Sequence, residues 1–209
     1  VVCGQCYQAC KEANNLEHTS NDFLKDHLSN NTFTVVEQYN NLYARKLCMH
    51  CNEPACVSVC LVGAITKNEW GTTQPRIRKC NMCTDRVNAG QLPACVESCP
   101  TEATLFGDKD QLIEIARKRL KDNPQNYYQH IYGLEEAGGS HVMVLSPVPF
   151  EQLGYISHLP KKAMPDFTAQ AMDKIPSVVV GGGVFLAGMY WLTKRKNQIA
   201  KEEKNNKRN

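Results

Sequence analysis

The spacing of eleven cysteines constrains this chain more than any other feature. They form three groups, and each group opens with a CxxC pair and closes with a CxxxC pair: Cys3, Cys6 and Cys10; Cys48, Cys51, Cys56 and Cys60; Cys80, Cys83, Cys95 and Cys99. An odd number of cysteines cannot be consumed by internal disulfides, and 209 residues are many for a disulfide-stapled scaffold. We therefore expect another use for these thiols.

The last two groups share more than their spacing. Cys56-Val-Ser-Val-Cys60 is followed by Ala64, and Cys95-Val-Glu-Ser-Cys99 is followed by Ala103 at the same offset. This self-similarity predicts an internal duplication.

Three chemistries could use such groups. Disulfides do not require the repeated spacing, and an all-thiolate zinc site could be built from Cys48, Cys51, Cys56 and Cys60. The CxxC turns, the CxxxC segments and the Cys99-Pro100 step are typical of proteins that bind [4Fe-4S] clusters. We favour the clusters, and a zinc-binding interaction module is the alternative.

Composition and charge narrow the class of protein. A mean hydropathy of -0.43 fits a folded soluble part and excludes a polytopic membrane protein. Residues 194–209 hold seven Lys or Arg and two Glu, so the basic character is concentrated in a tail. A nucleic-acid-binding domain would carry that charge on its folded surface, so we expect no nucleic-acid partner.

The tail follows residues 175–193, which contain no charged side chain and have the length of a transmembrane helix. Tyr190 and Trp191 lie where an interfacial aromatic belt would lie, and Gly183 with Ala187 forms a small-xxx-small step for packing against another helix. The positive-inside rule predicts a cytoplasmic C-terminus and a cysteine domain on the periplasmic or outer side of the cell membrane.

The segment before this span has a globular pattern. Asp108 is expected to cap a helix over 109–121, and residues 140–148 are expected to form a short strand. Residues 149–174, with three prolines, suggest an irregular connector. The chain is predicted to divide into five parts: a cysteine domain (1–107), a helix and strand packed on it (108–150), a connector (151–174), a transmembrane span (175–193) and a tail (194–209).

Other polar residues near the cysteines have plain interpretations. His50 lies inside a CxxC pair and is expected in a loop or beside the ligands, whereas Asp85, Arg86 and Glu97 are expected at the solvated surface. We find no catalytic triad, phosphate-binding loop or paired carboxylates. No catalytic residue of the chain's own is predicted.

Four segments together resemble the membrane-anchored iron–sulfur subunit of respiratory oxidoreductases: 48–60, 78–103, 138–153 and the C-terminal span. The resemblance is greatest to the electron-transfer subunit of periplasm-facing nickel–iron uptake hydrogenases, with the formate dehydrogenase beta subunit a near relation. It implies an α+β fold of duplicated bacterial-ferredoxin-like modules followed by one transmembrane helix. It also implies four [4Fe-4S] clusters, a catalytic partner, and a quinone-reactive membrane subunit or cytochrome b.

The chain departs from that family in three places: Leu61 follows Cys60 where the family has proline, and two segments are absent. A leading cysteine of the first motif would fall immediately before Val1, and a third cysteine motif has no room between Ile65 and Pro75. We expect residues to be missing at the start and near 67–68; a natural deletion is the alternative.

The resemblance also implies how the cysteines are shared among the clusters. Cys10, Cys80, Cys83 and Cys95 form one complete set, and Cys3, Cys6 and Cys99 belong to a second. Cys48, Cys51, Cys56 and Cys60 belong to a further pair of clusters. The implied role is to relay electrons from a catalytic partner toward the membrane.

Overall fold

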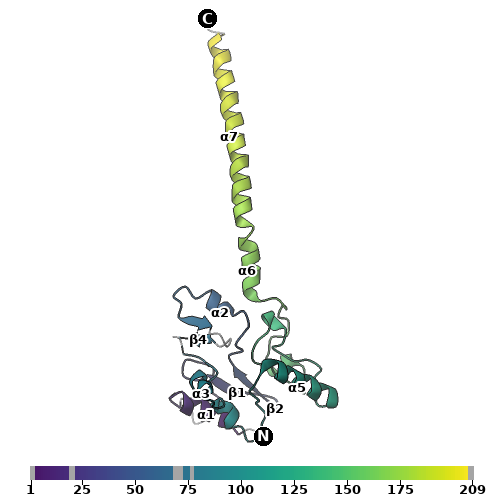
Figure 1. Cartoon of the computed structure of the whole chain (residues 1–209). Coiled ribbons are helices and arrows are strands. Elements are labelled where there is room, and N and C mark those ends of the chain that lie inside the picture. Colours follow the sequence, from purple (N-terminus) through teal and green to yellow (C-terminus); the bar gives the residue numbers. More distant parts are fainter. Residues whose placement is uncertain (1–2, 19–21, 68–72, 76–77, 207–209) are drawn as a thin grey trace. The chain divides into compact units, whose positions relative to one another are not determined.

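The computed structural model describes residues 3–18, 22–67, 73–75 and 78–206 (Figure 1). The chain divides into two compact units, Val1–Pro165 and Asp166–Asn209. The boundary falls inside the connector predicted over 151–174. The cysteines all belong to the first unit.

The described strands form two antiparallel hairpins. In the first, β1 (Thr34–Tyr39) pairs with β2 (Leu42–Leu47), and in the second, β3 (Ile65–Lys67) pairs with β4 (Thr73–Pro75). The β1–β2 turn uses Asn40 at φ +53°, a left-handed conformation that asparagine tolerates better than most residues. Val35 on β1 and Ala44 on β2 are buried, which fixes the register of this hairpin.

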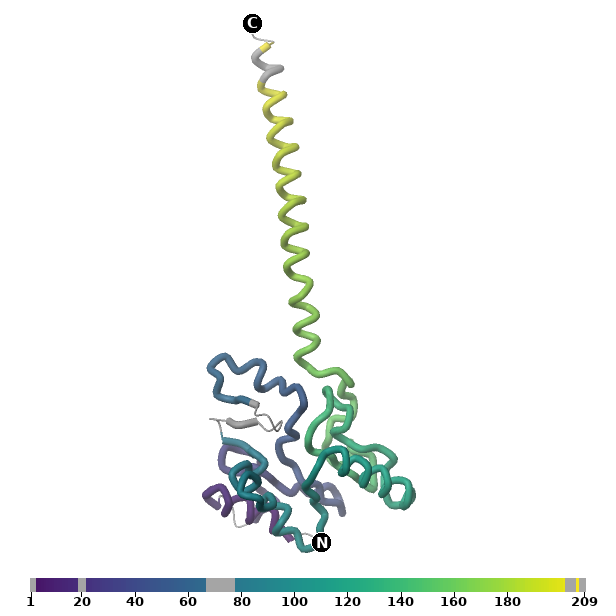
Figure 2. Tube along the Cα trace, viewed as in Figure 1, coloured from purple at the N-terminus to yellow at the C-terminus, as the bar shows by residue number. Residues whose placement is uncertain are grey.

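Short helices carry or adjoin most of the cysteines. They are α1 (Gln5–Ala13), α2 (Ala55–Ser58), α3 (Thr84–Asn88) and α4 (Ala94–Glu97). α1 and α4 are distant in the sequence but pack against each other, and α1 also contacts β1 (Figure 2). This packing brings the first and third cysteine groups together.

The apolar core of the first unit is small. Leu16 and Phe33 are buried with the Cys10 side chain, and Cys80 packs against them. A second aromatic group surrounds Phe150, whose ring lies 5.1 Å from that of Tyr132. Because Cys10 belongs to the core and Cys80 packs against it, what these thiols bind is expected to matter for folding.

The helix predicted over 109–121 is confirmed as α5 (Lys109–Asp122). The Asp108 carboxylate accepts hydrogen bonds from the backbone N–H groups of Asp110 and Gln111, both at 3.1 Å. Ala116 is buried, and the helix presents this side to the body of the unit.

The strand predicted over 140–148 is wrong. Only single bridges form there, Cys51 with Ser140 and Tyr132 with Val144. The Ser140 hydroxyl instead donates to the carbonyl oxygens of Gly133 and Val142, which folds the segment on itself. Before it lies η1 (Glu136–Gly138), and η2 (Phe150–Leu153) follows it.

The second unit is helical. α6 (Met164–Met172) begins just inside the first unit, and α7 (Ile175–Asn206) follows. The irregular connector predicted over 149–174 is therefore partly wrong, because α6 is regular. Pro165 is its second residue, and proline is tolerated in the first turn, where its missing N–H would have no partner within the helix.

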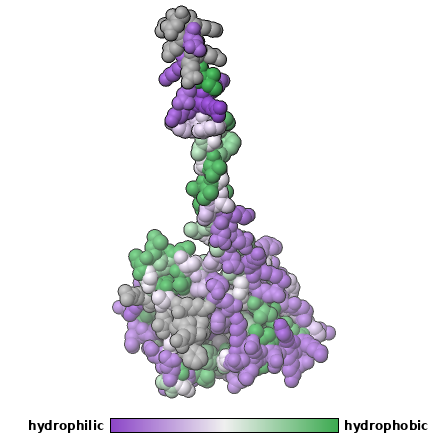
Figure 3. Space-filling view, turned by 45° about the horizontal axis from the view of Figure 1, so that its top comes forward, coloured by the Kyte–Doolittle hydropathy of each residue, from purple (hydrophilic) through white to green (hydrophobic). Residues whose placement is uncertain are grey.

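By length and composition, the segment Met164–Lys201 could cross a membrane, and its most apolar part is not buried against the rest of the protein. Figure 3 shows apolar residues along α7 and hydrophilic ones toward its C-terminal end. The chain thus combines helices and small sheets with one apolar C-terminal helix. Duplication of whole modules stays a prediction.

Candidate iron–sulfur site

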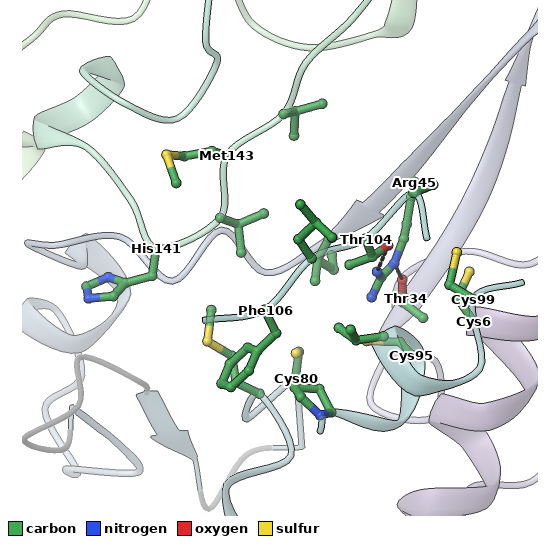
Figure 4. Close-up of a pocket in the computed structure, with 18 of the residues that line it drawn as sticks. Cys6, Thr34, Arg45, Cys80, Cys95, Cys99, Thr104, Phe106, His141 and Met143 are labelled. Carbon is green, nitrogen blue, oxygen red and sulfur yellow. Dashed lines mark hydrogen bonds between the residues drawn. The ribbon is translucent and has the colours of Figure 1, made fainter. Parts of the chain in front are cut away.

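Seven cysteines line one cavity of 1870 Å³ in the first unit: Cys3, Cys6, Cys10, Cys80, Cys83, Cys95 and Cys99. Ordinary small-molecule pockets measure roughly 300–1,000 Å³, so this one has room for more than one inorganic group. Figure 4 shows Cys6, Cys99, Cys95 and Cys80 around it. The cavity collects the first and third cysteine groups and none of the second.

Helix α1 positions two of these thiols. Cys6 and Cys10 are four residues apart and therefore share one helical face. Gly4, which caps the helix, has φ +63°, and a Cβ there would lie 2.9 Å from the Phe23 ring. The Cys3-Gly4 step thus needs glycine to turn the chain from Cys3 into the helix.

The Cys80–Cys83 turn depends on left-handed backbone conformations. Met82 and Cys83 have φ +54° and +52°. The Asn81 side chain accepts the Cys83 N–H at 3.0 Å, and the Thr84 hydroxyl donates to the Asn81 carbonyl at 2.6 Å. These bonds hold a tight loop that turns Cys80 and Cys83 to the cavity.

The two Pro-Ala-Cys loops have matching local structure. Pro54 and Pro93 each precede a four-residue helix with cysteine at its second position, α2 and α4. The N–H of Cys60 donates to the Val57 carbonyl at 3.1 Å, as does the N–H of Cys99 to the Val96 carbonyl at 3.1 Å. The sequence repeat is therefore also a repeat of local backbone geometry.

Burial and mutual repulsion act on the cavity thiols. Burial raises the pKa of Cys10 to about 12, and the charges of Cys80 and Cys95 add to that effect. Burial also raises the pKa of Cys80 to about 12, with Cys48 and Cys95 acting in the same direction. The pKa of Cys83 is raised by burial as well. A cofactor that needs thiolates must displace these protons.

The last cysteine of each repeat, Cys60 or Cys99, has a lowered pKa rather than a raised one. The backbone N–H groups of Ile65 and Ala64 lower the pKa of Cys60, and the Ala64 N–H lies 3.2 Å from its sulfur. Burial opposes ionisation of Cys99, but hydrogen bonds from Thr101 and Ala103 prevail and lower its pKa. Both loops are thus built to favour a thiolate.

The second cysteine group lies next to the cavity set. The Lys79 ammonium is 3.2 Å from the Cys48 sulfur. Burial, followed by the charges of Cys48 and Cys56, raises the pKa of Cys51. The charge of Cys48 also raises the pKa of Cys80, so the second cysteine group is close enough to the cavity cysteines to interact with them electrostatically.

Comparison with known proteins identifies the chemistry. Residues 67–109 match the family model described as a 4Fe-4S dicluster domain. The chain is similar to a protein of Nitratidesulfovibrio vulgaris (36% identical, 97% of this chain and 66% of that protein). It is also similar to the Hydrogenase-2 operon protein HybA of Escherichia coli O157:H7 (29% identical, over 73% of this chain and 69% of that protein). A third similar protein is the nitrate-inducible formate dehydrogenase iron-sulfur subunit of Escherichia coli K12 (30% identical, over 68% of this chain and 63% of that protein).

This chain is a ferredoxin-type iron–sulfur protein. Its cofactors are [4Fe-4S] clusters. It spans about two thirds of the length of the relatives named above. The alignment with the Nitratidesulfovibrio protein runs over 248 positions, more than the 209 residues of this chain, so that relative has internal residues with no counterpart here.

The donor set of the iron–sulfur protein fits clusters better than a single ion. All eleven cysteines are free thiols. Within the described residues, no three His, Cys, Asp or Glu side chains converge on a point that could hold one metal ion. Repeated CxxC and CxxxC spacing supplies the thiolate donors that [4Fe-4S] clusters use.

The structure brings together two of the implied ligand sets, here called the outer sets: Cys10, Cys80, Cys83 and Cys95, and Cys3, Cys6 and Cys99. Their assignment as ligands stays a prediction. Glu97 is largely exposed and pairs with Arg86, and Asp85 is exposed, in agreement with a solvated surface. His50 has φ +49° and 1% exposure, and within the described part of the chain neither ring nitrogen has a hydrogen-bond partner.

Sequence reasoning missed Arg45, which lines the cavity from β2. Strand alternation places it on the same face as Tyr43 and Leu47, but nothing local indicates that this face meets the cysteines. Lys79 was also missed. Its position directly before Cys80 was the available signal.

Proposed function

We propose that this iron–sulfur protein is the electron-relay subunit of a membrane-bound respiratory complex. The observation that carries the proposal is that seven cysteines from separate segments of the chain line a single cavity, beside the Cys48–Cys60 group. Clusters held in adjoining sets can pass single electrons from one to the next without any bond being made or broken. We expect the chain itself to turn over no substrate, because a relay leaves the chemistry to a catalytic partner.

The ligand sets follow the cysteine groups. Cys10, Cys80, Cys83 and Cys95 hold one complete cluster. Cys3, Cys6 and Cys99 contribute to a second, and the Cys48–Cys60 group to further ones, so that a chain with the missing motif would hold four. The boundaries proposed for the cysteine domain and the tail are 1–107 and 194–209.

The catalytic partner is a nickel–iron hydrogenase, and a molybdopterin enzyme such as a formate dehydrogenase is the alternative. The HybA and formate dehydrogenase relatives support both equally, at 29% and 30% identity. The electrons leave to a quinone-reactive membrane subunit or cytochrome b that contacts the glycine-containing side of α7. The clusters lie on the periplasmic side and the C-terminus is cytoplasmic.

Purification of the complex tests this proposal. We expect iron and acid-labile sulfide in equal amounts, and a nickel-containing subunit that co-purifies with the chain. Zinc without sulfide would overturn the relay, whereas a molybdopterin subunit would overturn only the choice of partner. A reporter that is active only in the cytoplasm, fused after residue 209, is expected to be active; an expressed but silent fusion would reverse the topology.

A further inference from the structure

Arg45 is a cation placed inside the cysteine cavity. It extends from β2 and lines the cavity together with all seven cysteines of the two outer sets. Figure 4 shows its side chain with Cys95 on one side and with Cys6 and Cys99 on another. Arg45 therefore lies next to members of both sets.

Two threonines hold the guanidinium in place. Its Nε donates to the Thr34 hydroxyl at 2.9 Å, and an Nη donates to the Thr104 hydroxyl at 3.1 Å. Thr34 is on β1 and Thr104 follows the Cys99 loop, so the anchors come from different parts of the fold. The Tyr155 hydroxyl, at 2.9 Å from the Arg45 carbonyl oxygen, adds a backbone contact. The charge is fixed rather than free to turn to solvent.

No carboxylate neutralises this guanidinium among the ion pairs of the described residues. Burial alone would lower the pKa of Arg45, but the charges of Cys95 and Cys6, with a hydrogen bond to Cys95, raise it above its ordinary value. Once the cavity cysteines become cluster ligands, the negative charge beside Arg45 is that of their thiolates and of the cluster. An arginine also keeps its charge at any pH at which the protein folds.

We propose that Arg45 is a positioning and tuning residue that raises the reduction potentials of the two clusters held by the cavity cysteines. This rests on the proposed cluster binding. Each cluster becomes one unit more negative when it accepts an electron, and a fixed cation close by stabilises that reduced form. The outer clusters would thereby be kept reducible although their surroundings are buried.

The test is an EPR-monitored redox titration of the purified, cluster-loaded full chain. In Arg45→Gln we expect both cavity clusters to be harder to reduce, by about tenfold in the reduction equilibrium, which is a shift of about 59 mV toward negative potential for one electron. Arg45→Lys, which keeps the charge, is expected to stay closer to the unaltered chain. Arg117→Gln is the matched control, because Arg117 is an exposed residue of α5 outside the cavity.

Unchanged potentials in Arg45→Gln, or equal shifts in the Gln and Lys variants, would overturn the role of the charge. If Arg45→Gln does not hold clusters, Thr104→Val gives the readout, since it keeps the cation and removes one anchor. In Thr104→Val, a negative shift of the reduction potentials that is smaller than the one expected for Arg45→Gln supports the proposal. Unchanged potentials contradict the proposal. Failure of the proposed function differs from all these results, because the unaltered chain would then contain no clusters to titrate.

Discussion

At the residue scale, Gly133 shows how single positions hold the loops beside the cysteines. Its backbone has φ +90°, and a Cβ there would lie 2.3 Å from the Val142 carbonyl oxygen. Its N–H donates to the Glu136 carboxylate at 2.8 Å. Hydrogen bonds of His141 and Val142 N–H to the carbonyl groups of His50 and Met49 tie this loop to the second cysteine group.

Gly133→Ala is expected to destabilise the chain by about 1–2 kcal/mol for the left-handed backbone and about 1–3 kcal/mol more for the forced contact. Gly90→Ala is the control, because Gly90 has φ +75° but nothing within 4 Å of an added Cβ. Denaturant midpoints measure both. Equal losses in the two variants would refute the steric argument.

Cys95→Ala is expected to remove the cavity cluster of the complete set and with it about four iron atoms per chain. Cys56→Ala is the control, since Cys56 does not line the cavity and its loss should leave that cluster's EPR signal. Iron analysis and EPR spectra check this prediction. Full iron content in Cys95→Ala would contradict the proposed ligand set.

At the scale of elements, α5 is a helix that the local sequence dictates. Asp108 satisfies two of the N–H groups that no helical carbonyl can reach, and Ala116 faces inward. The strand expected over 140–148 fails because a strand needs a partner, and this segment meets only single residues. The helix prediction was confirmed because helical hydrogen bonds join residues close in the sequence. The strand prediction was wrong because strand hydrogen bonds depend on a distant segment.

Asp108→Ala is expected to cost about 0.5–2 kcal/mol of stability through loss of the cap. Asp122→Ala, at the other end of α5, is the comparison, because a carboxylate at a helix C-terminus faces the negative end of the helix dipole. Its removal should be neutral or slightly stabilising. Urea unfolding of both variants measures the difference, and an equal loss in each would refute the capping role.

At the scale of the whole molecule, the two units differ in what stabilises them. The first has a small apolar core that includes Cys10 and contacts Cys80. The second is one helical segment whose apolar side chains are exposed along α7. The first unit is expected to depend on its clusters, and the second on a lipid surrounding.

Removal of iron with a chelator under reducing conditions is expected to unfold the first unit while α7 stays helical in detergent. Amide hydrogen exchange checks this, with protection lost over β1 and β2 and kept over residues 178–192. A chain treated with chelator that retains protection in β1 and β2 would show that the clusters are not needed for folding.

The sequence alone predicted the [4Fe-4S] clusters, the α5 helix with its cap, and the apolar C-terminal helix, because each depends on residues close together in the chain. CxxC spacing, a capping aspartate and an uncharged run act over a few residues. The family resemblance implied that Cys10 groups with Cys80 and Cys95, and the tertiary structure places all three in one cavity. Only the tertiary structure decided that Arg45 and its two threonines enter the same cavity. Those placements result from the packing of α1 against α4 and β1, contacts between distant segments that no local pattern encodes.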